Sequence, residues 1–164
     1  ALNGALTVGT YDGANIEIRE AVGEDNFFLF GLKENEIQAM RPAYNPRKYY
    51  EESEYIKRIL NAINSNMFCE KDTPALFKPI FDELLNRDFF FVLADLEAFN
   101  NAMKDAEHSY LNKNEWAKKA IYNVANVGYF SSDRAVDEYA RKIWHVCDVT
   151  AESCEEQELE AKSA

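Results

Sequence analysis

The chain has 164 residues, of which 47% are hydrophobic and 13% aromatic, and this composition excludes intrinsic disorder over most of its length. Its length corresponds to about one domain, which can bury roughly two-thirds of the surface of the unfolded chain. The formal net charge of −11 argues against a nucleic-acid partner, since nucleic-acid backbones are themselves anionic. No apolar run approaches the ~20 residues that span a bilayer, so no membrane partner is expected.

The acidic residues and the cysteines are unevenly placed along the chain. Residues 148–164 contain six acidic residues and one lysine, a net charge of −5, and we expect a solvated tail there. The cysteines Cys69, Cys147 and Cys154 form no CxxC motif, which disfavours a zinc ribbon or a disulfide scaffold, although a Cys147–Cys154 disulfide is a minor alternative. With no secretory signal in view, these features predict a reducing, cytoplasmic location.

The first thirty residues predict a β–α–β unit. Residues 5–10 suit a short strand, and a helix follows from Ala14 and is closed by Gly23. The apolar run 27–30 predicts a second strand that is buried on both faces, as in a parallel sheet. A crossover between two such parallel strands is expected to be right-handed.

Hydrophobic periodicity predicts helices over most of the remaining chain. A short polar helix over 34–40 is stopped by Pro42, and Asn45 followed by Pro46 begins another turn or helix. Five further helices are predicted from apolar stripes with the spacing of one helix face. The stripes are Ile56, Ile59, Leu60 and Ile63; Phe77, Ile80, Phe81 and Leu84; Leu96, Phe99, Met103, Ala106 and Tyr110; Trp116, Ala120, Val124 and Val127; and Val136, Tyr139, Ala140 and Ile143.

Capping residues mark the expected starts of three of these helices. Thr73 followed by Pro74 suits the start of the helix that carries the second stripe. Asn112 with Glu115 three residues later predicts a capping box for the fourth, and residues 131–133 cap the last.

The aromatic run 89–93 is either a short strand or a buried connector, and its phenylalanines, like Phe27 and Phe28, are interpreted as core. In total the sequence predicts an α/β chain with two or three short strands and five to seven helices. Two strands are too few for an independent doubly wound sheet, so we expect the sheet to continue in a part of the protein outside this chain.

The turn after the first strand is the best local candidate for chemistry. Residues 9–15, Gly-Thr-Tyr-Asp-Gly-Ala-Asn, join a strand to a helix, where backbone N–H groups can bind an anion. The segment contains neither a GxGxxG fingerprint nor the Gly-Lys-Ser/Thr of a phosphate loop. The simpler interpretation is a tight turn in which Asp12 caps the helix and Gly13 adopts a positive φ.

The other titratable residues form no catalytic constellation. His108 and His145 have no Cys or Asp at metal-ligand spacing, and His145 suits the end of the last helix, where a cation is favoured. The acidic groups at 51–52, 152 and 155–156 are interpreted as solvated surface or tail. The residues alone therefore predict no catalytic, cofactor-binding or metal-binding position.

Several blocks of the chain resemble glycogen (α-glucan) phosphorylase in sequence, order and spacing across residues 2–144, whereas 34–75 is less distinctive. The blocks are LNGALTVGT (2–10), DGANIE (12–17), EDNFFLFG (24–31), ADLEAF (94–99), Glu115-Trp116, FSSDR (130–134), EYA (138–140) and Ile143-Trp144.

The resemblance implies an enzyme that uses pyridoxal 5′-phosphate (PLP) and transfers a glucosyl unit from the non-reducing end of an α-1,4-glucan to phosphate, giving glucose 1-phosphate with retained configuration. It also implies a cytoplasmic, usually homodimeric protein with two Rossmann-like domains of the GT-B glycosyltransferase type and the site between them. This chain would be a helix-rich C-terminal part of the second domain. Residues 1–147 would belong to that domain and its closing helices, and 148–164 would form an acidic, flexible tail.

In the family, the PLP lysine and the phosphate-binding residues lie upstream of the block found here at 2–10. We therefore expect no catalytic residue and no covalently bound PLP in this chain, an upstream phosphorylase segment as its partner, and no activity of the isolated chain. Asp12 and Asn15 match a motif near the cleft and are candidates for supporting residues. Two alternatives are a non-catalytic helical interaction module derived from that family, and an anion-binding α/β domain that uses the turn 12–15.

Overall fold

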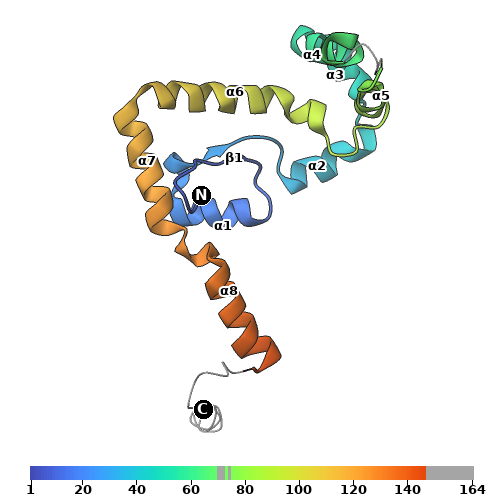
Figure 1. Ribbon diagram of the computed structural model, residues 1–164. Coiled ribbons are helices and arrows are strands. Elements are labelled where there is room, and N and C mark those ends of the chain that lie inside the picture. The colour runs from blue at the N-terminus through green and yellow to red at the C-terminus, as the bar shows by residue number, and fades with distance from the viewer. Residues whose placement is uncertain (70–72, 74, 147–164) are drawn as a thin grey trace, which may run out of the picture.

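The structure is a computed structural model that describes residues 1–69, 73 and 75–146. It begins with the predicted β–α–β unit: β1 (Val8–Gly9), α1 (Ala14–Val22) and β2 (Phe28–Leu29). The two strands are parallel, with Val8 opposite Phe28 and Gly9 opposite Leu29. Both strands are only two residues long, shorter than the sequence predicts. Figure 1 shows them beside α1, near the N-terminus.

Helices make up most of the rest of the described chain. The helices are α2 (Glu34–Met40), α3 (Pro46–Glu52), α4 (Glu54–Asn64), α5 (Lys78–Asn86), α6 (Val92–Leu111), α7 (Lys113–Asn126) and α8 (Ser132–Tyr139). Single 3₁₀ turns cover Glu24–Asn26, Arg41–Ala43, Asn66–Phe68 and Gly128–Phe130, and a π-helical turn, Ala140–Trp144, follows α8. The described residues thus contain eight α-helices, one more than the upper end of the predicted range.

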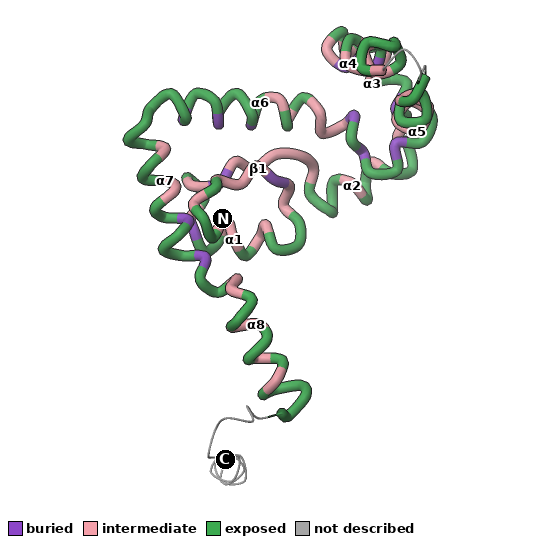
Figure 2. Tube along the Cα trace, viewed as in Figure 1, coloured by how far each residue is buried: buried purple, intermediate pink, exposed green. Residues whose placement is uncertain are grey.

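Six of the buried apolar residues form two separate clusters. Val22, Phe27 and Val127 form the strand cluster, which joins α1, the start of β2 and the end of α7. The helical cluster is formed by Ile56, Leu60 and Leu93, which join α4 to the start of α6. Figure 2 shows buried residues in both parts of the molecule, with the 20-residue α6 running between them.

The long helix α6 covers the strands with small side chains. Its buried positions beyond Leu93 are Ala102, Ala106 and Ser109, and the helix contacts both β1 and β2. Of the predicted apolar stripe, Phe99, Met103 and Tyr110 remain partly exposed, at 38%, 37% and 52%. The two strands are too short to cover the whole length of α6, so only part of its apolar surface is buried.

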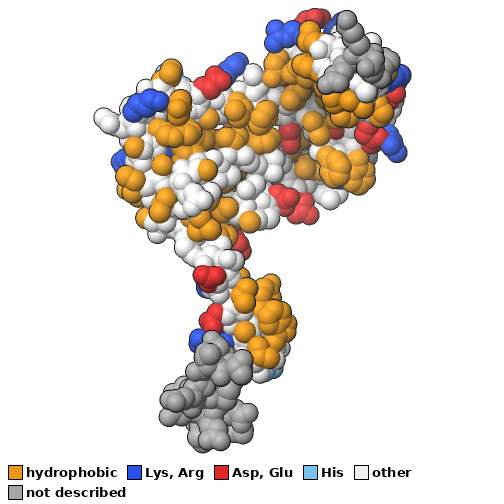
Figure 3. All heavy atoms as spheres, in the orientation of Figure 1, with side chains coloured by type: hydrophobic (Ala, Val, Ile, Leu, Met, Phe, Trp, Pro, Cys, Tyr) orange, Lys and Arg blue, Asp and Glu red, His pale blue; other side chains and the backbone are white. Residues whose placement is uncertain are grey.

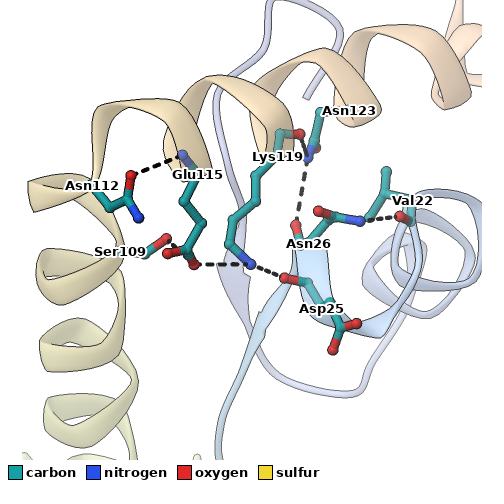
Figure 4. Close-up of polar contacts among 8 residues, drawn as sticks. All are labelled: Val22, Asp25, Asn26, Ser109, Asn112, Glu115, Lys119 and Asn123. Atoms are coloured by element: carbon teal, nitrogen blue, oxygen red, sulfur yellow. Dashed lines mark hydrogen bonds and ion pairs between the residues drawn. The ribbon is translucent and has the colours of Figure 1, made fainter.

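A hydrogen-bond network ties α7 to the turn after α1 (Figure 4). The Asn112 side chain accepts a hydrogen bond from the Glu115 N–H at 3.2 Å, which confirms Asn112 as the helix cap. The Glu115 carboxylate does not return to Asn112, as a full capping box requires; it accepts a hydrogen bond from Ser109 at 3.1 Å and lies 3.8 Å from Lys119. Lys119, with only 14% of its side chain exposed, donates to the Asp25 carbonyl. The network therefore holds α6, α7 and the α1–β2 connection together.

The start of α5 differs from the sequence prediction. The helix begins at Lys78, with Pro79 in its first turn, rather than directly after Thr73. Residues 75–77 form a turn, and Ala75 has a positive φ of 60° and donates its N–H to the Asn66 side chain at 2.9 Å. A proline does mark the helix start, as expected for its fixed φ, but it is Pro79.

The run 89–93 is neither a strand nor a buried connector. Phe89 and Phe90 are 63% and 79% exposed, whereas Phe91 is buried and precedes α6 with a φ of 59°. Asp88 produces this turn, because its buried carboxylate accepts hydrogen bonds from the N–H groups of Val92 and Leu93 at 2.9 and 2.8 Å. The interpretation of Phe89 and Phe90 as core residues is wrong, since the cap reverses the chain and turns both rings outward.

The last described helix extends beyond the rest of the molecule. Figure 3 shows hydrophobic side chains gathered along α8, and Val136, Tyr139 and Ile143 of its predicted stripe are 51–59% exposed. The expected hydroxyl cap is wrong: Ser131 is the N-cap position, but its side chain makes no capping hydrogen bond. Predictions for Cys147, Cys154 and the tail 148–164 lie outside the described residues. No described helix is long and apolar enough to cross a membrane.

Candidate functional site

The carboxyl ends of β1 and β2 open onto a groove with a volume of about 500 Å³. Ligands of open α/β sheets bind at this edge, outside the carboxyl ends of the strands. Most of the lining comes from the turn after β1, from α2 with the residue that follows it, and from the turn before α6, with single residues from α1, the β2–α2 connection and α6. The carboxyl-end groove is defined here by Tyr11, Asp12, Glu34, Arg41, Phe89 and Phe90.

The two candidate supporting residues lie on different sides of the β1–α1 turn. Asp12 is exposed and lines the groove, with its backbone N–H donated to the Thr10 carbonyl at 2.9 Å. Asn15 points back under the turn, and its Nδ2 also donates to the Thr10 carbonyl, at 3.1 Å. A Cβ on Gly9 would lie 2.6 Å from that Nδ2 atom, so the packing of Asn15 requires glycine there. Asn15 therefore shapes the turn, and Asp12 reaches the groove.

The expected helix cap by Asp12 is wrong. Gly13 is the N-cap residue of α1, with a φ of 51° as the sequence predicts, and no side chain caps this helix. The N–H groups of Asn15 and Ile16 are bonded within the turn, to the carbonyls of Asp12 and Gly13 at 3.1 and 3.2 Å. These N–H groups are consequently not available to an anion.

Asp95 is a groove residue that the sequence analysis did not single out. It projects from α6, and its Oδ1 accepts a hydrogen bond from the Leu32 N–H, just after β2, at 2.8 Å. Gly31 makes room for the carboxylate, since a Cβ there would lie 2.7 Å from Asp95 Oδ2. Asp95 stands in one of the family-like blocks, and Gly31 ends another. The sequence signal that could have identified Asp95 was therefore the occurrence of Gly31 and Asp95 in two blocks that resemble the same family.

Burial and neighbouring charges affect protonation at the groove. Burial raises the pKa of the Asp95 carboxyl, and Asp88 and Glu36 raise it further, while the hydrogen bond from Leu32 acts in the opposite direction. Behind the groove, burial and the hydrogen bond to Asp88 raise the pKa of Tyr44. The groove thus contains a carboxyl group that holds its proton more readily than an exposed aspartate.

The only guanidinium that lines the groove within the described residues belongs to Arg41. It lies over the rings of Phe89 and Phe91, 5.8 and 5.0 Å from their centroids, and makes no ion pair within the described chain. The carboxylates of Asp12, Glu34 and Asp95 outnumber it. This balance disfavours the anion-binding alternative for the turn.

The described residues contain no group of three or more His, Cys, Asp or Glu side chains placed to hold a metal ion. His108 is an exposed residue of α6, and His145 is exposed just after the π-helical turn, with a φ of 52°. Neither histidine lines the carboxyl-end groove.

Comparison with known proteins identifies the family. The family model described as carbohydrate phosphorylase matches residues 1–146. The chain belongs to this family. It is 46% identical to a glycogen phosphorylase of Synechocystis sp. over 153 residues, which cover 93% of this chain and 18% of the relative. It is 48% identical to a glycogen phosphorylase of Chlamydia trachomatis, covering 92% of this chain and 19% of the relative.

The human brain form of glycogen phosphorylase is 45% identical over 146 residues, which cover 88% of this chain and 17% of the relative. These matches confirm the resemblance found in the sequence blocks. The chain spans less than a fifth of the length of each of these three phosphorylases. The helix-rich structure with two short parallel strands is compatible with a part of an α/β phosphorylase.

Proposed function

We propose that this chain is part of an α-1,4-glucan phosphorylase, which transfers a glucosyl unit from the non-reducing end of the glucan to phosphate and releases glucose 1-phosphate. The observation that supports this proposal is the family match over residues 1–146, together with relatives named glycogen phosphorylase at 45–48% identity. The proposal includes a cytoplasmic location and a homodimer, as the family resemblance implies.

The proposed architecture is a portion of a Rossmann-like domain within a two-domain, GT-B-type enzyme. The parallel pairing of β1 and β2 across α1 supports it. A two-stranded sheet of this size is not stable alone in water, so we propose that further strands of the whole enzyme complete it. Residues 1–147 would belong to this domain and 148–164 to an acidic tail.

The described lysines do not fit the covalent attachment of PLP. A Schiff-base lysine needs an amine that can lose its proton in an enclosed pocket. All described lysines except Lys57 and Lys119 are exposed. Lys57 lies 3.5 Å from Glu54 on α4, and the Lys119 amine is held by the Asp25 carbonyl beside Glu115. We therefore assign no step of the reaction to the residues of this chain, and propose that other parts of the enzyme hold the cofactor.

Two parallel assays test the proposed function. The whole polypeptide that contains this chain is expected to release glucose 1-phosphate from maltoheptaose and inorganic phosphate. The 164-residue chain alone is expected to release none, and to lose all PLP absorbance on dialysis after incubation with PLP. An inactive whole polypeptide contradicts the proposed activity, and an active or PLP-retaining 164-residue chain contradicts the assignment of the chemistry to other parts.

The exposed stripe on α8 favours the second candidate function, a non-catalytic interaction module. Val136, Ile143 and Trp144 are each more than half exposed on one helical segment. Under this alternative the whole polypeptide would lack phosphorolysis. The activity assay on the whole polypeptide therefore separates the two candidates.

A further inference from the structure

Two aromatic rings in the carboxyl-end groove are exposed yet rigidly supported. Phe89 and Phe90 meet edge to face, with their centroids 5.1 Å apart and their planes at 87°. They follow Asp88, which is only 2% exposed and whose carboxylate caps α6 and accepts a hydrogen bond from the Tyr44 hydroxyl. The two rings therefore project from a backbone turn that is held in place by the buried hydrogen bonds of Asp88.

Two carboxylates beside these rings have no partner within the described chain, whereas the third, Asp95, accepts the hydrogen bond from Leu32. The carboxylates of Asp12 and Glu34 make no hydrogen bond or ion pair with described residues, and the Arg41 guanidinium contacts only aromatic rings there. Folding of the described chain therefore does not account for these groups. They converge with Phe89 and Phe90 on one groove, at the sheet edge where α/β proteins bind ligands.

The chemistry of the groove selects an uncharged polyhydroxy ligand. Asp12, Glu34 and Asp95 line the groove with Arg41, and Lys33 lies 5.6 Å from the ring of Tyr11, so the groove has no excess of positive charge to select a phosphate-bearing ligand. A pyranose ring has a C–H face that packs on an aromatic ring and a rim of hydroxyl groups that donate to carboxylates and accept from arginine. The groove volume of about 500 Å³ lies within the usual range for small-molecule sites.

We propose that the carboxyl-end groove is a binding subsite for a segment of α-1,4-glucan, in which a sugar ring packs on Phe89 and Phe90 while its hydroxyls bond Asp12, Glu34 and Arg41. This inference rests on the proposed function, which supplies the class of substrate. The subsite binds glucan without chemistry, because no described residue of the groove provides a nucleophile with its activating base. In the whole enzyme, this subsite would provide an additional contact for a long or branched glucan.

The test compares the glycogen affinity of the wild type with that of a variant, both measured in the whole polypeptide that contains this chain. Phe90→Ala removes the more exposed ring, and native gels containing increasing glycogen measure the dissociation constant from the retardation of the band. The dissociation constant is expected to rise roughly three- to tenfold, the loss expected for one aromatic contact. Phe90→Tyr keeps the ring face and is expected to restore retardation.

Phe68→Ala is the matched control, because Phe68 is 60% exposed but does not line the groove. Its dissociation constant for glycogen is expected to equal that of the wild type.

Unchanged retardation of Phe90→Ala in the whole polypeptide would overturn the subsite. If the thermal midpoint of that variant were also lowered, the ring would be covered by another part of the enzyme. Release of glucose 1-phosphate by the wild type, measured on the same preparations, separates failure of the subsite from failure of the proposed function.

Discussion

The strand cluster and the helical cluster bury their apolar residues in different ways. In the helical cluster, Ile56 and Leu60 are one turn apart on α4 and pack directly on Leu93 of α6. In the strand cluster, Val22 and Phe27 meet Val127, about a hundred positions later in the chain. Contacts between distant residues cost more loop-closure entropy to form. The helical cluster is therefore formed mainly by neighbouring helices, whereas the strand cluster depends on α7 returning to α1.

Side-chain hydrogen bonds contribute more to the strand cluster than to the helical cluster. Asn123, which is fully buried, donates from its side chain to the Lys119 carbonyl at 3.1 Å and to the Asn26 carbonyl at 3.5 Å. Asn26 in turn donates to the Val22 carbonyl at 2.7 Å. Directional hydrogen bonds thus fix how α7 docks, in addition to apolar burial. In the helical cluster the main polar element is the Asp88 cap at its edge.

Leu60→Ala should produce the largest loss of stability, because Leu60 is fully buried at the centre of the helical cluster. We expect about 2–5 kcal/mol lower free energy of unfolding, as for buried leucines in general. Urea unfolding of the whole polypeptide, followed by circular dichroism, measures it. Ile80→Ala, at a half-exposed position of α5, is the control and should cost much less. Equal losses in the two variants would contradict the assignment of this core.

Asp88→Ala should have the next largest effect, since it leaves two N–H groups of α6 and the Tyr44 hydroxyl without their acceptor. The expected cost is about 2–3 kcal/mol, typical of a lost charged acceptor for buried donors. The shift of the thermal midpoint reports it. Asp82→Ala removes an exposed carboxylate paired with Lys78 and should change stability by no more than about 1 kcal/mol. A midpoint for Asp88→Ala no lower than that of Asp82→Ala would refute the capping role.

Lys119→Met tests the polar contribution to the strand cluster. The variant keeps the length of the side chain but removes the bonds to the Asp25 carbonyl and Glu115. We expect a loss of about 1 kcal/mol and faster hydrogen exchange of the α7 amides, with the helical cluster unaffected. Lys118→Met, the exposed neighbour, serves as the control. Faster exchange spread over both clusters would break the distinction between them.

Asp95→Asn should have the smallest effect, and one that depends on pH. Because the folded protein raises the pKa of Asp95, its ionised form disfavours the folded state, and the wild type loses stability as pH rises from the unfolded pKa through the folded pKa. The asparagine variant lacks this loss, so its thermal midpoint relative to wild type should be higher at pH 7 than at pH 4. Asp105→Asn, at an exposed position of α6, provides the comparison. A difference between Asp95→Asn and wild type that does not vary with pH would contradict the raised pKa.

Much of the element order could be predicted because helix signals are local. The polar helix at 34–40 has the predicted bounds, and the helix bearing Ile56 and Leu60 buries both residues. Gly23, with a φ of 85°, closes α1 as its lack of a Cβ allows. Some errors are local, such as the caps expected from Asp12 and Ser131. Others depend on distant partners: Tyr44 bonds Asp88 at the Phe89–Phe90 turn, and the two strands cover only part of the α6 face.

The candidate site could be predicted only in part. Asp12 and Asn15 were found from a family-like block, but their opposite orientations follow from the close approach of Asn15 to Gly9. Asp95 meets the Leu32 N–H across 63 positions of sequence, a contact that no local pattern contains. The exposed rings of the groove were misassigned because two consecutive phenylalanines usually indicate a core.

The sequence by itself determined the family, the β–α–β start and the amphipathic helices, because motif blocks, glycine positions and apolar spacing are properties of neighbouring residues. Only the tertiary structure decided which aromatic side chains are exposed, which carboxylates share the groove, and how α7 returns to α1. Those outcomes depend on contacts such as that between Asn123 and Asn26, 97 positions apart. Such contacts form only when the chain folds, so they cannot be predicted from the spacing of neighbouring residues.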